Sequence, residues 1–131
     1  MKEKQLQDIT ALYGRLSRDD EVGGESMSIQ SQRAILGQYA KEHGFTNCRF
    51  FMDDGYSGTN FDRPAFTEMM EQVEQRRVRT IIVKDLSRLG RNYLEVGRYT
   101  EVIFPENKVR FIAITDGVDS AAGDNEFAPF K

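Results

Sequence analysis

Four apolar runs typical of buried strands are spaced along the chain, at residues 9–16, 48–52, 79–85 and 109–115. The third run contains Thr-Ile-Ile-Val at residues 80–83, a continuous apolar stretch of the kind found in parallel strands covered on both faces. Polar and glycine-containing segments lie between the runs, as expected where strands end. The pattern therefore predicts a sheet whose central strands are buried on both sides.

Between the first two runs the apolar residues follow helical spacing. Ser26 or Ser28 is placed to cap a helix that runs to about His43, and Gly44 is suited to end it. The apolar positions of this predicted helix are Ile29, Ile35, Leu36, Tyr39 and Ala40.

Two further helices are predicted downstream. Arg63-Pro64 follows Asp62 and places a proline in the first turn of a helix, which is a favourable position. Its apolar stripe, at i, i+3, i+4 and i+7, consists of Phe66, Met69, Met70 and Val73. The last helix is predicted from Asn92 to about Phe104. The residues expected on its apolar side are Tyr93, Val96, Tyr99 and Ile103.

Strands and helices alternate from one end of the chain to the other. Such alternation is typical of an α/β fold, here with a mostly parallel central sheet of four to five strands flanked by helices. A length of 131 residues is sufficient for one domain with its own core and too short for two ordinary ones.

Composition narrows the class of protein. The chain is 39% apolar and 30% charged, which is typical of a globular protein rather than a disordered one. No run approaches the roughly 20 apolar residues of a membrane span, and the first residues do not resemble a secretory signal. We therefore expect a cytoplasmic protein with no membrane partner.

Cys48 is the only cysteine and His43 the only histidine. Disulfide frameworks and zinc sites built from Cys and His are therefore excluded within one chain. A Ser-His-Asp triad would have to use His43, whose place at a predicted helix end favours a capping role against the helix dipole.

The formal net charge of −3 argues against an autonomous, non-specific DNA-binding protein, which would usually be basic. A local cationic site is still compatible with this charge, because the basic residues are unevenly spread. Those that crowd the central stretch are Arg76, Arg77, Arg79, Lys84, Arg88, Arg91 and Arg98.

Candidate chemistry begins at the end of the first strand. Alternate residues of an extended chain share a face, so Tyr13, Arg15 and Ser17 are expected to point the same way. This places a hydroxyl beside a permanent cation at the carboxyl end of a strand, where open α/β sheets usually bind their ligands. The arrangement suits a nucleophile held against a phosphate, although a solvated arginine beside a loop serine is the plainer alternative.

A second candidate follows the third strand, at residues 84–91. If this segment is helical, Ser87, Arg88 and Arg91 lie within one turn of one another. Arg88 and Arg91 would then form a pair of guanidinium groups suited to multidentate phosphate recognition. Gly90 between them allows a close approach of backbone or ligand. The alternative is a solvated basic face of a surface helix.

Four segments of the chain occur in an order and spacing that resemble those of a known family. They are Tyr13-Gly14-Arg15-Leu16-Ser17, Gln32 within residues 28–32, Asp54-Gly55-Tyr56-Ser57-Gly58 with Asp62-Arg63-Pro64, and Leu86-Ser87-Arg88-Leu89-Gly90-Arg91. Together they resemble the catalytic domain of the serine recombinases, the resolvase and invertase family, over residues 9–128. The Asp-rich stretch after Ser17 is most similar to the large serine recombinases of mobile elements.

The resemblance implies roles for these residues. Ser17 matches the nucleophile that attacks a DNA phosphodiester and forms a 5′-phosphoseryl link. The residues that match the phosphate pocket are Arg15, Arg63, Arg88, Arg91 and Gln32. Tyr13 and Asp53 fall near pocket positions. The sequence identifies no general base for Ser17.

The resemblance also implies partners. Family members act on double-stranded DNA as dimers and tetramers, and they rejoin the strands without a metal or nucleotide cofactor. We expect residues 1–131 to form the catalytic domain, ending before a long dimerisation helix and a DNA-binding region. Such a fragment is expected to bind DNA weakly and to be monomeric or weakly dimeric.

One departure from the family concerns Ser87. Many relatives carry an aspartate at this position, directly before Arg88, and a serine cannot be an anionic partner for an arginine. Asp85, two residues earlier, is a substitute only if the turn is irregular.

Two other functions are compatible with the sequence. A magnesium-dependent phosphodiesterase would use carboxylates at strand ends, since hard cations prefer carboxylate oxygen; the candidates are Asp53, Asp54, Asp116 and Asp119. The other is a non-catalytic assembly or regulatory module of the same fold. Ser57 and Ser87 are alternative hydroxyls to Ser17.

Overall fold

A computed structural model describes residues 8–17 and 28–121, and it confirms the α/β prediction. One five-stranded sheet has the strand order β2-β1-β3-β4-β5, in which the first four strands are parallel and β5 is antiparallel to β4. The strands are β1 (Ile9–Leu16), β2 (Cys48–Asp54), β3 (Val78–Val83), β4 (Arg110–Ala113) and β5 (Val118–Asp119).

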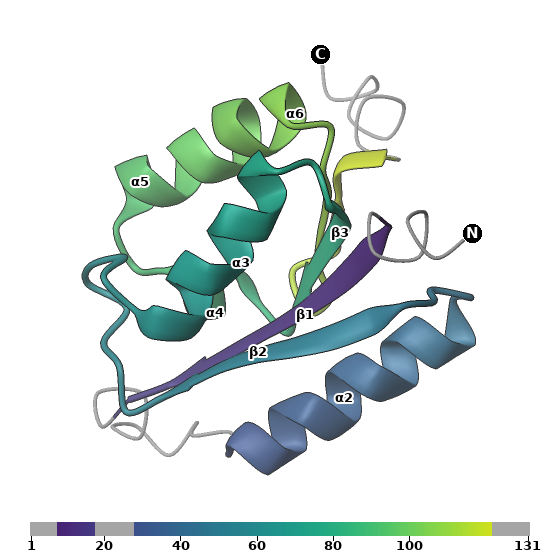
Figure 1. The fold of residues 1–131 in the computed structure, drawn as a ribbon. Helices are drawn as coiled ribbons and strands as arrows, with labels where there is room; N and C mark the ends of the chain where they lie inside the picture. Colours follow the sequence, from purple (N-terminus) through teal and green to yellow (C-terminus); the bar gives the residue numbers. More distant parts are fainter. Residues whose placement is uncertain (1–7, 18–27, 122–131) are drawn as a thin grey trace.

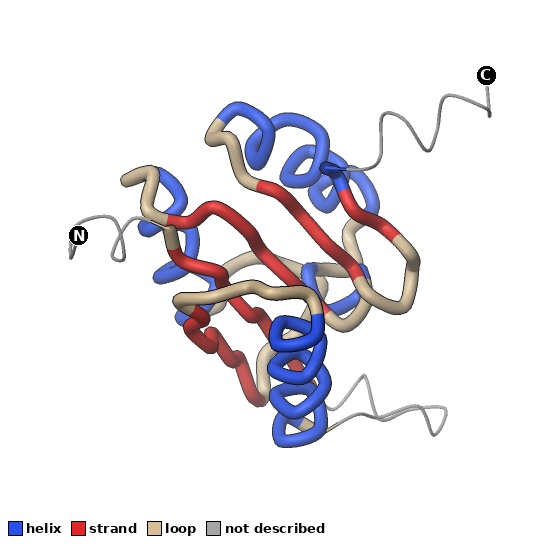
Figure 2. Tube along the Cα trace, turned by 90° about the vertical axis from the view of Figure 1, so that its right-hand side faces the viewer, coloured by secondary structure: helices blue, strands red, loops and turns tan. Residues whose placement is uncertain are grey.

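Helices cover both faces of the sheet. Among residues 8–17 and 28–121, α2 (Ile29–Glu42) covers one face, and the remaining helices lie on the opposite face (Figure 1). These are α3 (Pro64–Glu74), α4 (Leu86–Leu89), α5 (Tyr93–Arg98), the π-helical segment η2 (Tyr99–Ile103) and α6 (Phe104–Glu106). Figure 2 shows the same layers after a quarter turn, with helices on either side of the strands. Within residues 8–17 and 28–121, no helix is long and apolar enough to cross a membrane.

The sheet separates two hydrophobic cores. Beneath α2, Leu36 and Ala40 pack against Leu12, Ile82 and Ile112 of the three central strands. The larger core lies under α3 to α6; its buried members include Tyr13, Phe66, Met69, Val73, Ile81, Leu89, Phe104 and Phe111. Consecutive residues of β1 and β3 enter opposite cores, which explains why both strands are apolar throughout.

Local sequence signals explain where the helices begin. Ser28 is the N-cap of α2 and its side chain accepts a hydrogen bond from the Ser31 amide, whereas Ser26 lies outside the described residues. Pro64 occupies the first turn of α3, as predicted. At the end of α2, His43 is the C-cap and Gly44 has φ of +77°, a conformation that favours glycine.

The predicted last helix needs correction. Asn92 caps it as expected, but the helix changes to π-helical geometry at Tyr99 and runs on to Glu106. Tyr93, which was expected on the apolar side, is 88% exposed. The spacing that predicted its burial assumed 3.6 residues per turn throughout, and an i to i+5 segment shifts the register of residues on the two sides of it.

Candidate active site

The carboxyl ends of the parallel strands bring the predicted residues to one edge of the sheet. Ser17 directly follows β1, Asp53 lies in β2 opposite Arg15, and α4 follows β3 after two residues. Ser17 is 7% exposed and Asp53 only 1%. This edge is where ligands bind in open α/β sheets.

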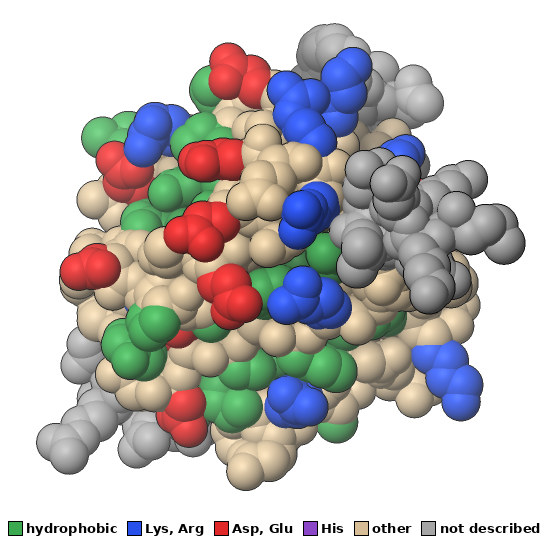
Figure 3. All heavy atoms as spheres, viewed as in Figure 1, with side chains coloured by type: hydrophobic (Ala, Val, Ile, Leu, Met, Phe, Trp, Pro, Cys, Tyr) green, Lys and Arg blue, Asp and Glu red, His purple; other side chains and the backbone are tan. Residues whose placement is uncertain are grey.

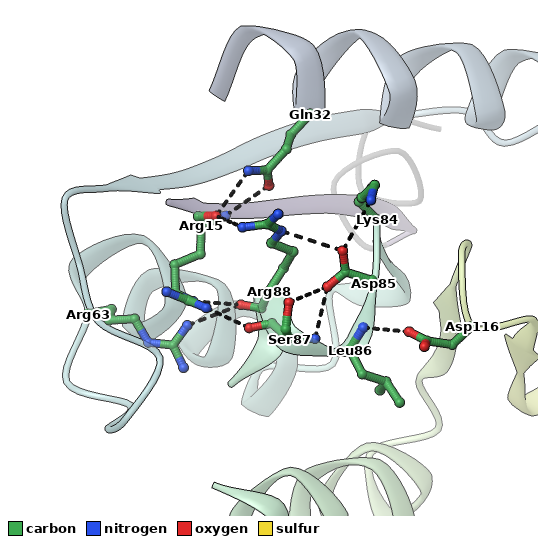
Figure 4. A network of polar contacts seen from close by, with 9 residues as sticks. All are labelled: Arg15, Gln32, Arg63, Lys84, Asp85, Leu86, Ser87, Arg88 and Asp116. Atoms are coloured by element: carbon green, nitrogen blue, oxygen red, sulfur yellow. Dashed lines mark hydrogen bonds and ion pairs between the residues drawn. The ribbon is translucent and has the colours of Figure 1, made fainter. Parts of the chain in front are cut away.

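Two buried arginines hold the one-turn helix α4 by its carbonyl groups. Arg15 donates from Nε to the Arg88 carbonyl at 3.3 Å and from Nη2 to the Ser87 carbonyl at 2.6 Å (Figure 4). Arg63 donates from Nη2 to the Leu89 carbonyl at 2.6 Å and from Nη1 to the Arg88 carbonyl at 3.4 Å. Both cations therefore lie at the carbonyl end of a helical turn, where positive charge is favourable.

The end of β1 is held in return by Arg88 and Gln32. Arg88 Nη1 donates to the Arg15 carbonyl at 3.1 Å. Gln32 is fully buried; its Nε2 donates to the same carbonyl at 3.0 Å, and its Oε1 accepts the Arg15 amide at 3.1 Å. These three contacts fix the backbone two residues before Ser17. Figure 4 shows the side chains meeting there from α2, β1 and α4.

Tyr13 connects two buried charges. Its hydroxyl donates to Asp53 Oδ2 at 2.7 Å and accepts from Arg63 Nη1 at 2.7 Å. Burial, together with the Asp53 carboxylate and against the charge of Arg63, raises the pKa of Tyr13 far above its ordinary value, so the phenol stays protonated. Asp53 also accepts the Ala65 and Phe66 amides, which caps α3.

The amino end of α4 is bound by carboxylates. Asp85 is its N-cap, in an extended conformation, and accepts the Ser87 amide at 3.0 Å. Asp116 Oδ2 accepts the Leu86 amide at 2.7 Å. Carboxylates at the amino end and guanidinium groups at the carbonyl end therefore match the dipole of this turn.

The prediction that one helical turn carries Ser87, Arg88 and Arg91 is wrong. The helix ends at Leu89, because Gly90 is extended, and Arg91 lies beyond it. Arg88 is buried at 4% exposure, whereas Arg91 is exposed. The two arginines therefore differ in environment and do not form a pair on one helix face.

Two glycines allow the loops of this edge to approach closely. A Cβ on Gly58 would lie 2.7 Å from Arg15 Nη2 and 3.0 Å from Arg91 Cγ. A Cβ on Gly90 would lie 2.6 Å from the Phe61 ring. The backbone of Gly58 also accepts the Arg91 amide at 2.7 Å. Side chains at either position would push these contacts apart.

The alternative hydroxyls have structural partners. Ser57 Oγ accepts the Thr59 amide at 3.0 Å within its turn. Ser87 Oγ makes a short hydrogen bond to Asp85 Oδ1. Ser17 lies directly after the β1 backbone that Arg88 and Gln32 hold.

The carboxylates of the metal-dependent alternative do not gather. Asp53 caps α3, Asp116 binds α4, and Asp119 makes a two-pronged pair with Arg110. Among the described residues, no group of three or more His, Cys, Asp or Glu side chains is arranged to hold a metal ion.

Sequence reasoning missed how the arginines are used here. Arg15 and Arg63 were predicted to bind phosphate, and that role stays a prediction; in this structure their guanidinium groups bind backbone carbonyls. No residue pattern signals a carbonyl acceptor, because every residue has one. The capping role of Asp85 had a signal, since Asp before a short helical segment is a common N-cap.

Comparison with known proteins identifies a family to which this chain is similar. A family model described as "Resolvase, N terminal domain" matches residues 10–128. The "Uncharacterized immunity region protein 3" of Bacillus phage phi105 is 30% identical over 64 residues, which cover 49% of this chain and 77% of the phage protein.

Solved structures agree with the family match. The N-terminal catalytic domain of TP901-1 integrase superposes with a TM-score of 0.79 and 26% identity, covering 92% of this chain and 87% of that domain. A resolvase family site-specific recombinase from Streptococcus pneumoniae superposes with a TM-score of 0.71 and 26% identity, covering 93% and 82% of the two chains. Each similarity therefore extends over more than nine-tenths of this chain.

Proposed function

The chain belongs to the resolvase N-terminal domain family and is a catalytic domain of the serine-type site-specific recombinases, and on that premise we propose that Ser17 is its nucleophile. One observation supports the assignment above the others. Arg15 and Arg63 both donate to the Arg88 carbonyl in the α4 turn, and the Arg88 guanidinium group donates to the Arg15 carbonyl, two residues before Ser17.

The proposed step is a transesterification on a DNA phosphodiester. The Ser17 Oγ forms a bond to phosphorus, and the bond from phosphorus to the 3′ oxygen breaks. The serine hydroxyl loses its proton and the departing 3′ oxygen gains one, so charge and atoms balance. The phosphoserine ester keeps the bond energy, and the reverse attack by a 3′ hydroxyl rejoins the strand.

Negative charge grows on the non-bridging oxygens of the phosphate during this step. Arginines stay charged when buried and offer several oriented donors, so they can stabilise that charge without reorganisation. We assign this role first to Arg88, which lies in the α4 turn, and to Arg91, two residues after it. Removing one oriented donor of this kind typically costs about a hundredfold in rate.

Arg15, Arg63 and Gln32 belong to the same proposed site, where they hold its backbone in place. In the present structure they hold α4 and the end of β1 through backbone groups. A phosphate contact by Arg15 or Arg63 would require these guanidinium groups to exchange a carbonyl acceptor for a phosphate oxygen. The Tyr13 hydroxyl accepts a hydrogen bond from Arg63 and donates one to Asp53, so both residues help to hold the Arg63 side chain.

The proposed partner is duplex DNA, since the family acts on DNA. Breaking both strands of two sites needs several active serines, so we propose that dimers and tetramers form on the DNA. A cytoplasmic location follows from the same proposal, because the DNA substrate is there.

The experiment compares covalent DNA adducts formed by matched serine variants of the intact recombinase. A nicked duplex that carries the recombination site traps the adduct, which migrates as a protein–DNA band after denaturation. Ser17→Ala should abolish the band, whereas Ser57→Ala should retain it and Ser87→Ala, which keeps the Ser17 hydroxyl, should still form it at a lower rate. A band that persists in Ser17→Ala and disappears in either control variant would overturn the assignment.

A further inference from the structure

The Asp85 carboxylate lies between three groups at the start of α4. Its Oδ1 accepts the Ser87 amide and makes the short hydrogen bond with the Ser87 hydroxyl. Its Oδ2 lies 3.6 Å from Arg88 Nε and 3.4 Å from Lys84 Nζ. One oxygen therefore anchors the carboxylate to the turn, and the other faces two cations (Figure 4).

The environment keeps this carboxylate ionised. Burial of Asp85 opposes ionisation, but the Ser87 hydrogen bond and the charges of Arg88 and Lys84 outweigh it and lower the pKa of the carboxyl group. The side chain is 18% exposed and that of Arg88 only 5%, so solvent screens their attraction less than on an open surface. Asp85 is therefore an anion beside Arg88 at neutral pH.

Arg88 is held from two directions as a result. Nη1 reaches the Arg15 carbonyl in β1, and Nε faces Asp85 in its own turn. An arginine side chain has several rotatable bonds, and fixing both ends of the planar guanidinium group restricts them. The Nη1 hydrogen bond and the 3.6 Å ion pair at Nε lie on different edges of the guanidinium group, so together they favour one orientation of its plane.

We infer that Asp85 is a positioning residue for the proposed reaction: its carboxylate, fixed by the Ser87 hydroxyl, sets the orientation of the Arg88 guanidinium group. This inference rests on the proposed function, in which Arg88 faces the phosphate. It also accounts for Ser87, whose hydroxyl serves Asp85 and is not a second nucleophile. Asp85, at the N-cap position, is thus the anionic partner of Arg88, a role that the uncharged Ser87 cannot have.

Asp116 provides a matched control. It carries the same charge and also binds a backbone amide at the start of α4, that of Leu86 at 2.7 Å. Asp85→Asn and Asp116→Asn therefore remove one negative charge each from the same turn. Asparagine still accepts a hydrogen bond from a backbone amide, so both caps are retained. Only Asp85→Asn removes the ion pair with Arg88.

The test measures DNA binding and adduct formation separately, with the intact recombinase and the nicked duplex that carries its site. Asp85→Asn should form the adduct about tenfold to a hundredfold more slowly, the usual cost of a misplaced catalytic group. It should bind the duplex as tightly as the wild type or more tightly, because a negative charge has been removed. Asp116→Asn should bind in the same way and keep its adduct rate within about twofold.

The inference is wrong if Asp85→Asn forms adducts at the wild-type rate, or if both variants slow by the same factor. Loss of binding together with adduct formation in Asp85→Asn would also contradict it, since that result indicates a damaged fold. Thermal unfolding of each variant separates a damaged fold from a misplaced side chain.

A second readout does not depend on catalysis. Arg88 Nε lies 3.6 Å from the Asp85 carboxylate, so its signal in a ¹⁵N NMR spectrum of this chain should have the same chemical shift in the wild type and in Asp116→Asn. In Asp85→Asn the signal should move or broaden, because the guanidinium group loses its fixed orientation. An unchanged signal contradicts the inference even if Ser17 proves not to be the nucleophile, whereas a changed signal supports the Asp85–Arg88 contact on its own.

Discussion

Arginines at the two ends of the strands have very different surroundings. At the carboxyl end, Arg15 and Arg63 are 0% and 1% exposed, and each donates to several acceptors. At the amino end, the Arg79 side chain is 67% exposed and pairs with Asp8, while that of Arg110 is 39% exposed and pairs with Asp119. The same residue type is therefore part of the interior at one end and of the surface at the other.

The difference follows from the cost of burying charge. A buried guanidinium group must be surrounded by acceptors, and losing one partner leaves a charge that water cannot reach. A surface pair loses little when broken, because water replaces the partner. Figure 3 shows most Lys and Arg side chains of one face in its right half and most Asp and Glu in its left, in open contact with solvent. The buried arginines are thus the ones whose replacement should alter the whole domain.

The largest effect is expected for Arg63→Met. Arg63 holds two α4 carbonyls and Tyr13, and its guanidinium group lies 4.7 Å from the Phe61 ring centre. Its removal takes a charged donor from the Tyr13 hydroxyl and from both α4 carbonyls, and we expect about 3 to 5 kcal/mol less stability by urea unfolding. Arg79→Met, the control at the amino end, should lose no more than about 1 kcal/mol. Equal losses would contradict the distinction between the two ends.

A smaller effect is expected for Tyr13→Phe. The variant keeps the ring that packs against Phe66 but removes the hydroxyl that links Asp53 to Arg63. Leaving these buried groups one partner short should cost about 1 to 3 kcal/mol in urea unfolding. Tyr93→Phe is the control, because Tyr93 is 88% exposed and its hydroxyl is in solvent. A Tyr13→Phe protein as stable as the control would show that the hydroxyl bridge is not needed.

Gly58→Ala tests how tightly Arg15 is enclosed. The new methyl group would lie 2.7 Å from Arg15 Nη2 and 2.8 Å from Cζ, so the guanidinium group or the loop must move. We expect a loss of about 1 to 2 kcal/mol, typical of overpacking, together with slower adduct formation. Gly97→Ala, in α5 and with nothing within 4 Å of its Cβ, should be neutral or stabilising. Identical behaviour of the two variants would contradict the tight fit at Gly58.

The smallest effect concerns Asp119→Asn at the amino end. The hydrogen bonds from Arg110 hold the pKa of Asp119 below its ordinary value, so the ion pair stabilises the fold above the unfolded pKa of about 4. The wild type should exceed the variant by no more than about 1 kcal/mol at pH 7. That difference should disappear as the pH falls through the folded pKa. A difference that stays constant down to pH 2 would show that charge is not its source.

The fold could be predicted largely because its signals are local. Ser28 caps α2 and Pro64 starts α3, as their side-chain and ring chemistry dictates. The strand β1 matches its predicted bounds, since an apolar run flanked by polar residues leaves little freedom. The two-residue strand β5 is too short to show a pattern of its own; its pairing with β4 comes from tertiary contact.

The site was less predictable because its bonds join distant parts of the chain. Nothing near Arg15 in the sequence indicates that its acceptors are the carbonyls of residues 56, 87 and 88. The end of α4 depends on the extended conformation of Gly90 against Phe61, which a helical pattern does not include. Residue types could be predicted to gather at one edge, whereas their partners required the folded chain.

The most direct measurement identifies the residue that carries DNA after cleavage. The adduct trapped on the nicked duplex is digested with protease and nuclease, and the modified peptide is sequenced by mass spectrometry. The proposal predicts a nucleotide joined through its 5′ phosphate to Ser17. A nucleotide joined to Ser57, Ser87 or any other side chain would contradict it.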